Sequence, residues 1–222
     1  MTKEEITNRA KDIRDNLKEK SQYCRYNEIN TKLDVIPPFV GNDEIKLIII
    51  GQDPTVQNSE SRKNIKCTLN LDKSNSLRTY IEFICNKLQI SVDDNVYATN
   101  VFKYFYSKPP AQTMCVLYEH LMDNLALLKE EIKQYQKAII ITLGEPVLKL
   151  LTTEKEEVKR YWGYNRINNE TRCDKNKFQV CENNKLERNF YVLPHVDYKR
   201  KIFYKENICD YLNYIKESAK IH

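Results

Sequence analysis

The sequence predicts an α/β fold, a three-layer α/β/α arrangement around a central, mainly parallel four-stranded sheet. Two observations predict it. Four short apolar runs recur along the chain, and segments with helical spacing of apolar residues separate them. The runs are also continuous, as in strands that are buried on both faces of a parallel sheet. They lie at 47–50, 96–102, 138–144 and 189–195.

Helical spacing is clear in the first half of the chain. Residues 3–22 carry one apolar stripe, made of Ile6, Ala10, Ile13 and Leu17. The stretch 34–42 contains two prolines and a glycine and is expected to be an extended connection. A further helix is expected over 76–88, with Ser76 as its N-cap.

The pattern in the second half of the chain predicts three more helices and one irregular segment. One long helix is expected over 113–135, with an inner side formed by Leu117, Leu121, Leu125 and Leu128. The next helix opens around Pro146, where a missing amide proton costs little. The polar segment 161–188 is expected to be a loop or irregular hairpin, and a closing helix runs from about 204 to 220.

Length and composition predict one domain inside the cell. A chain of 222 residues fits a single domain over 1–222, with a helical extension at 1–33 and a polar insert at 161–188. No apolar run approaches the ~20 residues that cross a bilayer. Residues 1–20 lack the apolar centre of a secretory signal. We expect a monomer in the cytoplasm, or in the nucleus of a eukaryote, with no membrane partner.

The cysteines and the net charge set further expectations. Seven cysteines without a C-x-x-C pair argue against a disulfide framework and against a zinc or iron–sulfur site. Reduced, mostly buried thiols and no bound metal are expected. The net charge of +5 has the sign that suits a polyanionic partner, although many proteins share it.

Each predicted strand is followed by polar or special residues. They are Gln52 and Asp53, then Asn100, then Gly144 and Glu145, then His195. In parallel α/β folds the working residues gather just beyond the carboxyl ends of the strands. One such residue alone is often a helix cap or a core histidine, but four convergent positions indicate a site.

Several motifs resemble the uracil-DNA glycosylase superfamily. The string GQDP at 51–54 resembles the water-activating motif of its main uracil-excising family, which usually reads GQDPYH. Four more strings follow in that family's order: NSLRTYIEF, YATN, IIITLGEPV and VLPHVDYKR. The resemblance covers about residue 37 to the C-terminal helix. It implies a monofunctional DNA glycosylase that hydrolyses the N-glycosidic bond of uracil or a C5-modified pyrimidine and leaves an abasic site.

The resemblance assigns catalysis to Asp53 and His195. Breaking an N-glycosidic bond builds positive charge on the sugar and negative charge on the departing base. Asp53 is expected to activate the water and to stabilise the sugar cation. His195, if neutral, is expected to donate to the base oxygen that becomes negative. Neither a metal nor an organic cofactor is expected.

Base binding is assigned to Gln52, Thr55, Leu69 and Asn100. Asn100 is expected to read the base edge, because a carboxamide offers a donor and an acceptor side by side. Thr55 stands where the family usually has a tyrosine that crowds C5 and keeps thymine out. Leu69 stands where it has a stacking phenylalanine. The smaller threonine suggests a pyrimidine bulkier than uracil at C5.

DNA is the expected partner, with the target nucleotide flipped out of the stack. Lys199, Arg200 and Lys201 follow His195 and are assigned to phosphate contacts, although a solvated basic run explains them as well. Ser76 matches a backbone-pinching serine, or simply caps its helix. Glu145 replaces another such serine and would repel a phosphate.

Two alternatives stay open at this stage. The first is a catalytically weak DNA- or nucleotide-binding member of the same superfamily. The second is an unrelated α/β fold in which GQDP is an ordinary turn. The chain has neither a G-x-x-x-x-G-K-[ST] loop nor a G-x-G-x-x-G fingerprint, which argues against the common nucleotide-binding folds.

Overall fold

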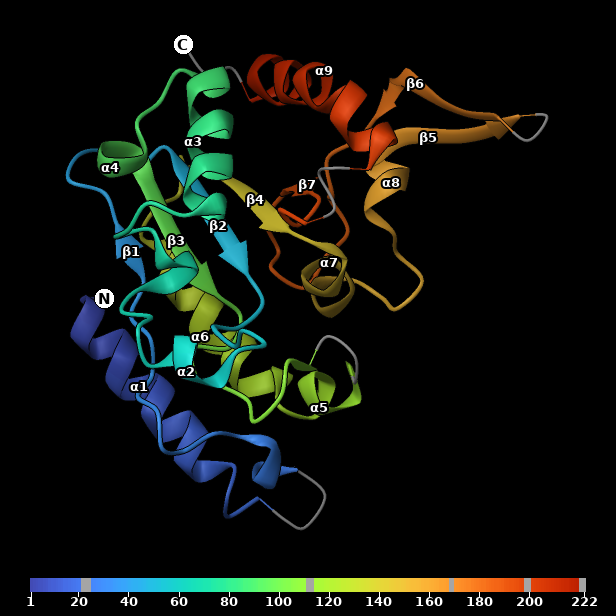
Figure 1. Cartoon of the computed structure of the whole chain (residues 1–222). Helices are drawn as coiled ribbons and strands as arrows, with labels where there is room; N and C mark the ends of the chain where they lie inside the picture. The colour runs from blue at the N-terminus through green and yellow to red at the C-terminus, as the bar shows by residue number, and fades with distance from the viewer. Residues whose placement is uncertain (21–24, 111–113, 168–169, 198–200, 220–222) are drawn as a thin grey trace.

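The structure is a computed structural model that describes residues 1–20, 25–110, 114–167, 170–197 and 201–219. Its centre is a five-stranded sheet of order β1-β3-β2-β4-β7 (Figure 1). The four strands predicted from the sequence are parallel to one another. They are β2 (Leu47–Gly51), β3 (Val96–Asn100), β4 (Ile139–Leu143) and β7 (Tyr191–Leu193). The prediction of an α/β fold with a mainly parallel sheet is confirmed.

The sheet has one strand more than the sequence predicted. β1 (Phe39–Val40) lies in the stretch that was expected to be only an extended connection. It pairs antiparallel with β3, with Phe39 opposite Ala98. Two prolines precede it, and proline cannot donate to a sheet ladder. This composition fits a very short strand at the edge of the sheet.

Helices flank the sheet (Figure 1). These helices pack in two pairs. α1 (Lys3–Asn16) contacts α6 (Leu121–Lys133), and α3 (Ser76–Leu88) contacts α9 (Ile202–Ser218). The middle strands β2 and β3 are buried along their whole length. This burial is the reason for their continuous apolar sequence, since both faces of the sheet are covered.

The long helix expected over 113–135 is two helices, α5 (Met114–Glu119) and α6, separated at His120. The His120 side chain is buried, and its Nδ1 lies 3.1 Å from the hydroxyl of Tyr106. The two rings also stack, with centroids 5.8 Å apart. These tertiary contacts fix the position of His120 and interrupt a segment whose apolar spacing alone predicts one helix.

The N-cap of α3 is Asn75 and not Ser76, which corrects the sequence-based expectation. The Asn75 side chain accepts hydrogen bonds from the N–H groups of Leu77 and Arg78, both at 2.9 Å. Ser76 is the first residue of the helix, and it is exposed. Asparagine and serine are comparable N-caps, so composition could not decide between neighbours.

The polar insert is an ordered antiparallel hairpin with a short helix before it. After α7 (Glu145–Leu151), the chain forms α8 (Val158–Tyr161), β5 (Trp162–Ile167) and β6 (Glu170–Phe178). The hairpin extends beside α9, away from the central sheet (Figure 1). Trp162 is fully buried, and its Nε1 donates to the carbonyl of Val192 at 2.7 Å. That contact attaches the hairpin to β7.

The remaining helices are short: α2 (Ser59–Arg62), α4 (Val92–Asn95) and 3-10 turns at Tyr26–Glu28 and Thr68–Asn70. Within the part of the chain that the structure describes, no helix is long and apolar enough to cross a membrane.

Candidate active site

The ends of β2 and β3 bring the segment that leads to Gln52 and Asp53 alongside Asn100. Gly51 lies opposite Asn100 in the parallel ladder. Hydrogen bonds of 2.9 Å continue beyond the strands, from Val101 N to the Gly51 carbonyl and from Phe102 N to the Gln52 carbonyl. The segment that leads to Asp53 therefore leaves the sheet alongside Asn100, at the edge where α/β folds place their ligands.

The Asp53 carboxylate is held by its sequence neighbours. Gln52 Nε2 donates to Oδ1 at 2.7 Å, and Thr55 N–H donates to Oδ2 at 2.9 Å. The carboxyl is surrounded by protein atoms, although part of the residue is open to solvent. Burial raises the pKa of Asp53 to about 6, and hydrogen bonds from Thr55 and Gln52 together with the charge of Arg62 oppose that rise. The group titrates near neutral pH, as a catalytic acid or base does.

Arg62 is a buried cation that the sequence analysis missed. It is 3% exposed, and its guanidinium donates to three carbonyl oxygens. The distances are 2.8 Å to Val56, 2.9 Å to Tyr106 and 2.9 Å to Ser107. Arg62 thereby joins the loop after Asp53 to the segment that carries Tyr106.

Asn100 and Leu69 meet over Gly51. A Cβ atom at position 51 would lie 2.4 Å from Asn100 Oδ1 and 2.9 Å from Leu69 Cδ2, so a larger residue there would displace these two side chains. Asn100 is 1% exposed, and no described residue forms a hydrogen bond with its Oδ1. A buried, unpaired acceptor costs about 1–3 kcal/mol. The oxygen is buried and lacks a hydrogen-bond donor among the described residues.

Leu69 is held in an unusual backbone conformation. Leu69 and Asn70 have φ values of 57° and 53°, in the left-handed region that side chains other than glycine rarely adopt. The turn is fixed by neighbours: Thr68 N–H donates to the Pro37 carbonyl at 3.0 Å, and Asn75 Nδ2 donates to the Asn70 carbonyl at 2.7 Å. Residues with such strained backbone conformations cluster at active sites and ligand-binding sites. Here the turn directs Leu69 onto Gly51.

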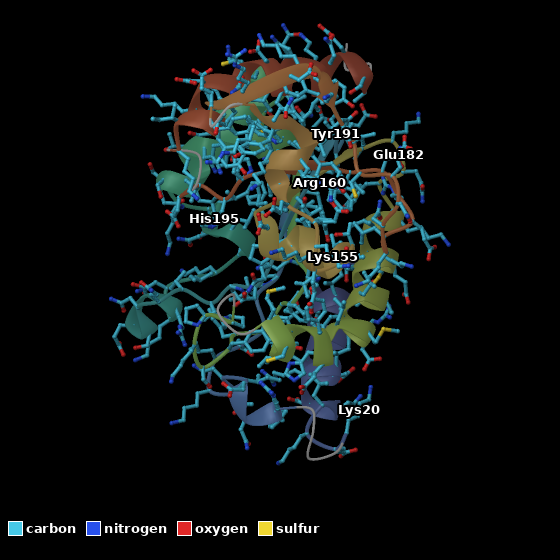
Figure 2. All side chains as sticks on the ribbon, turned by 90° about the vertical axis from the view of Figure 1, so that its right-hand side faces the viewer. Lys20, Lys155, Arg160, Glu182, Tyr191 and His195 are labelled. Atoms are coloured by element: carbon cyan, nitrogen blue, oxygen red, sulfur yellow. The ribbon has the colours of Figure 1, made fainter. Side chains whose placement is uncertain are left out.

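His195 follows β7, above the glycine turn that ends β4. Gly144 has φ +90°, and a Cβ atom there would lie 3.3 Å from His195 Cβ. The His195 side chain is 45% exposed, and Nδ1 lies 3.2 Å from Asp197 Oδ2 and 3.5 Å from Asp197 N. Figure 2 shows His195 at the margin of the molecule. The structure thus places His195 at a strand end of the same sheet, as the sequence predicted.

Two of the residues assigned to DNA contacts, Ser76 and Lys201, lie at the starts of α3 and α9. Ser76 and Lys201 are exposed, and Lys201 is the residue before α9. Lys199 and Arg200 lie outside the described residues. The start of α3 is linked to the His195 loop, because the Tyr80 hydroxyl donates to the Pro194 carbonyl at 3.2 Å. Glu145 forms an ion pair of 2.9 Å with Lys149 of its own helix.

An ion pair lies beneath Asn100, and the sequence analysis missed it. Lys103 and Glu131 are 1% and 0% exposed, and Lys103 Nζ lies 2.7 Å from Glu131 Oε2. The same Nζ donates to the Asn100 carbonyl at 3.0 Å, and the Tyr97 hydroxyl donates to Glu131 Oε1 at 2.6 Å. A lysine within the aromatic string VFKYFY was the available signal. Fully buried lysines are rare unless they are paired.

Aromatic residues near Asp53 belong to the core. The negative charge of Asp53 contributes to raising the pKa of the Tyr104 and Tyr106 hydroxyls, after the larger effect of burial. The two side chains are 0% and 1% exposed, and their ring centroids are 5.6 Å apart. Both rings are buried in the core, so neither has a face open for stacking on a base.

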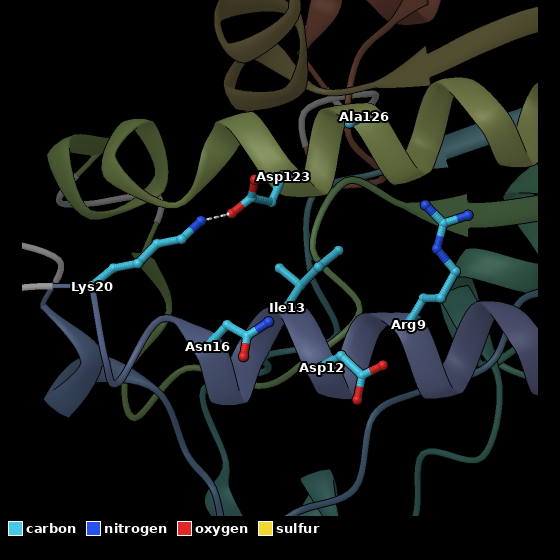
Figure 3. Close-up of a pocket in the computed structure, with 7 residues that line it drawn as sticks. All are labelled: Arg9, Asp12, Ile13, Asn16, Lys20, Asp123 and Ala126. Atoms are coloured by element: carbon cyan, nitrogen blue, oxygen red, sulfur yellow. Dashed lines mark hydrogen bonds and ion pairs between the residues drawn. The ribbon is translucent and has the colours of Figure 1, made fainter.

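A pocket of about 320 Å³ lies elsewhere, between α1 and α6 (Figure 3). Its lining includes an ion pair between Lys20 and Asp123. It contains none of the predicted site residues, and Lys20 lies well apart from His195 in Figure 2. In the described ranges, no group of three or more His, Cys, Asp or Glu residues is arranged to hold a metal ion.

Comparison with known families gives one match. The model of a family described as the uracil DNA glycosylase superfamily matches residues 38–213. No individual curated protein matches the chain. The match spans all five strands of the sheet and every predicted site residue, and it excludes the unrelated α/β fold. The chain belongs to the uracil-DNA glycosylase superfamily.

Proposed function

We propose that the protein is a monofunctional DNA glycosylase that removes uracil or a C5-modified pyrimidine from DNA and leaves an abasic site. Its superfamily hydrolyses N-glycosyl bonds in DNA, which supports the reaction class. One observation carries the proposal. Asp53, whose carboxyl pKa is raised to about 6, and Asn100, whose buried side-chain oxygen has no hydrogen-bond partner among the described residues, stand at the ends of the adjacent strands β2 and β3.

Asp53 serves the sugar side of the reaction. When the C1′–N1 bond breaks, the base leaves with the electron pair and the sugar becomes cationic. Water then adds at C1′ and loses a proton, and no metal or organic cofactor is required. With a pKa of about 6, Asp53 is mostly ionised at pH 7 and above, so it can orient that water, accept its proton and stabilise the cation.

Asn100 serves the base side. Its unpaired Oδ1 is an acceptor and suits the N3–H donor of uracil or a 5-substituted uracil, while Nδ2 can donate to O4. Cytosine presents an acceptor at N3, which would face Oδ1 without a hydrogen bond. In the tautomer with its proton on Nε2, His195 would donate to O2 as negative charge develops there.

The residues around the base edge support a substrate larger than uracil at C5. Thr55 and Leu69 replace two aromatic side chains of the related family, and both are smaller. Gln52 and the backbone after Asp53 complete the base-binding set. On the DNA side, we assign Ser76, Lys199, Arg200 and Lys201 to the strand that surrounds the flipped nucleotide, through phosphate contacts.

Gly51→Ala is expected to lower base release by about 100-fold, because displacing a positioning group by about 1 Å has an effect of that size. The added Cβ would meet Asn100 Oδ1 at 2.4 Å and displace it. Single-turnover excision kinetics measure the effect. Gly41→Ala is a matched control, since its Cβ would meet the backbone of Asp94 at 2.3 Å, away from Asn100. Equal losses in the two variants would contradict a specific role for Gly51.

The proposed function is tested with labelled single- and double-stranded oligonucleotides. These carry uracil, thymine mispairs or C5-modified pyrimidines, with cytosine as the negative control. Alkali then cleaves the DNA at abasic sites. Breaks at a pyrimidine establish the glycosylase and identify its substrate. Binding of DNA without breaks in any substrate would favour a DNA-binding member of the superfamily. Rapid uracil release with no release of a C5-substituted base would exclude the larger substrate.

A further inference from the structure

Arg62 is a buried cation that joins two segments of the candidate site. We propose that Arg62 is a positioning residue, which holds the turn after Asp53 in place by binding backbone carbonyls on both segments. This inference rests on the proposed catalytic function of Asp53. It gives a role in the reaction to a residue that touches neither the base nor the sugar in the proposed steps.

The guanidinium of Arg62 contacts segments that lie far apart in the sequence. Its Nε donates at 2.8 Å to the carbonyl of Val56, three residues after Asp53. Its Nη1 donates to the carbonyls of Tyr106 and Ser107, both at 2.9 Å. A guanidinium is planar and its N–H groups point in fixed directions, so these bonds set the position of one segment relative to the other. The single nitrogen of a lysine, on a flexible stem, would not reproduce this geometry.

A second set of contacts leads from Tyr106 back to the Asp53 carboxylate. Tyr106 N–H donates to Thr55 Oγ1 at 2.7 Å. Thr55 N–H in turn donates to Asp53 Oδ2 at 2.9 Å. The backbone of Tyr106 is therefore bound to Arg62 through its carbonyl and to Thr55 through its N–H. A shift of this segment would move Thr55, and with it the N–H group that holds the carboxylate.

The burial of Arg62 supports a specific role. Only 3% of Arg62 is exposed, and its hydrogen-bond partners among the described residues are the three carbonyl oxygens. Burying a charge is costly unless the charge is well hydrogen-bonded, and arginines are rarely buried to this extent. All three of these bonds go to the turn after Asp53 or to the segment that is bonded to this turn. The cost of burial is therefore offset where it orders the site.

The chain offers a matched control in Arg188. This half-buried arginine also donates to backbone carbonyls, at 2.8–3.2 Å, and they belong to the end of α6 and the connection to β4. The four acceptors are Ile132, Tyr135, Gln136 and Ala138. None of them is a candidate site residue. Arg62→Lys and Arg188→Lys therefore make the same chemical change at two arginines that bind carbonyls, and only Arg62 contacts the turn after Asp53.

Two measurements on the full chain test the inference. Amide hydrogen exchange of the free protein reports how firmly the turn is held, and single-turnover excision at saturating DNA reports the rate of base release. Arg62→Lys is expected to speed exchange of the Thr55 and Tyr106 amides by about 10-fold or more. It is expected to lower the rate of base release by about 100-fold, with the dissociation constant for DNA unchanged. Arg188→Lys should leave these amides and this rate at their wild-type values.

Three results would overturn the inference. They are wild-type exchange at Thr55 and Tyr106 in Arg62→Lys, faster exchange there with an unchanged rate of base release, and equal losses of that rate in the two arginine variants. Arg62→Gln replaces Arg62→Lys if the lysine variant does not fold. Because hydrogen exchange needs no turnover, these results are distinguishable from failure of the proposed function, which is an inactive wild-type protein.

Discussion

Asp53→Asn is expected to lower base release strongly and, at neutral pH, to make the folded protein more stable. Loss of the carboxylate removes the proton acceptor and the anion opposite the sugar, a loss of about 10²–10⁴-fold for a general base. The stability gain follows from the pKa of about 6, which lies above the value of ~3.9 expected in the unfolded chain. Excision assays and urea unfolding measure the two effects.

The sign of the pH dependence makes this prediction sharp. Between about pH 4 and 6 the folded state binds more protons at Asp53 than the unfolded state, so the stability contributed by this group falls as pH rises. At pH 7.5 the ionised carboxyl costs about 1–3 kcal/mol, and asparagine removes that cost. Below about pH 4 Asp53 is protonated in both the folded and the unfolded state, so Asp53→Asn and the wild-type protein should have the same free energy of unfolding. The exposed Asp43→Asn is the control, expected to stay within about 0.5 kcal/mol at either pH.

Lys103→Met is expected to lower the free energy of unfolding by about 3–5 kcal/mol, because it leaves Glu131 as an unpaired buried charge. The variant also removes the donor to the Asn100 carbonyl, so base release should fall in the molecules that still fold. Urea unfolding followed by circular dichroism measures the first effect. The double variant Lys103→Met/Glu131→Leu should recover much of the loss, since both charges are then absent.

The matched control is an exposed ion pair on α6, the helix that carries Glu131. Lys129 of α6 pairs with Glu187, whose side chain is 79% exposed, and exposed ion pairs contribute only about 0–1 kcal/mol. Lys129→Met should therefore change the free energy of unfolding by less than about 1 kcal/mol. If Lys103→Met is as mild as this control, the buried pair does not support the strand end that carries Asn100.

The sequence predicted the part of the fold that depends on local pattern. The runs at β2, β3, β4 and β7 are continuous and apolar because the sheet is covered on both faces. Once the strands are assigned as parallel, their carboxyl ends share one edge, which is why Asp53 and Asn100 could be grouped in advance. Their chemical roles, and those of His195 and the basic residues, stay predictions.

The features that were missed depend on contacts between distant segments. His120 interrupts a helical pattern because it packs on Tyr106. The left-handed backbone of Leu69 is imposed by its surroundings and cannot be read from a residue type that normally avoids it. Lys103 pairs with Glu131, which lies 28 positions away in the sequence. Arg62 donates to the carbonyls of Tyr106 and Ser107, which lie 44 or more positions away. Spacing rules within one helix or strand do not reach that far.

The burial of Arg62 has a consequence for how ionic strength acts on this protein. Mobile ions screen exposed charges over about 8 Å at physiological salt, but they do not enter the protein interior. With 3% of its surface exposed, Arg62 is screened by salt much less than an exposed cation, so its effect on Asp53 depends little on ionic strength. Exposed lysines such as Lys201 have no such protection. Added salt therefore weakens the attraction that brings a polyanion to the surface, while the electrostatic field inside the site stays nearly constant.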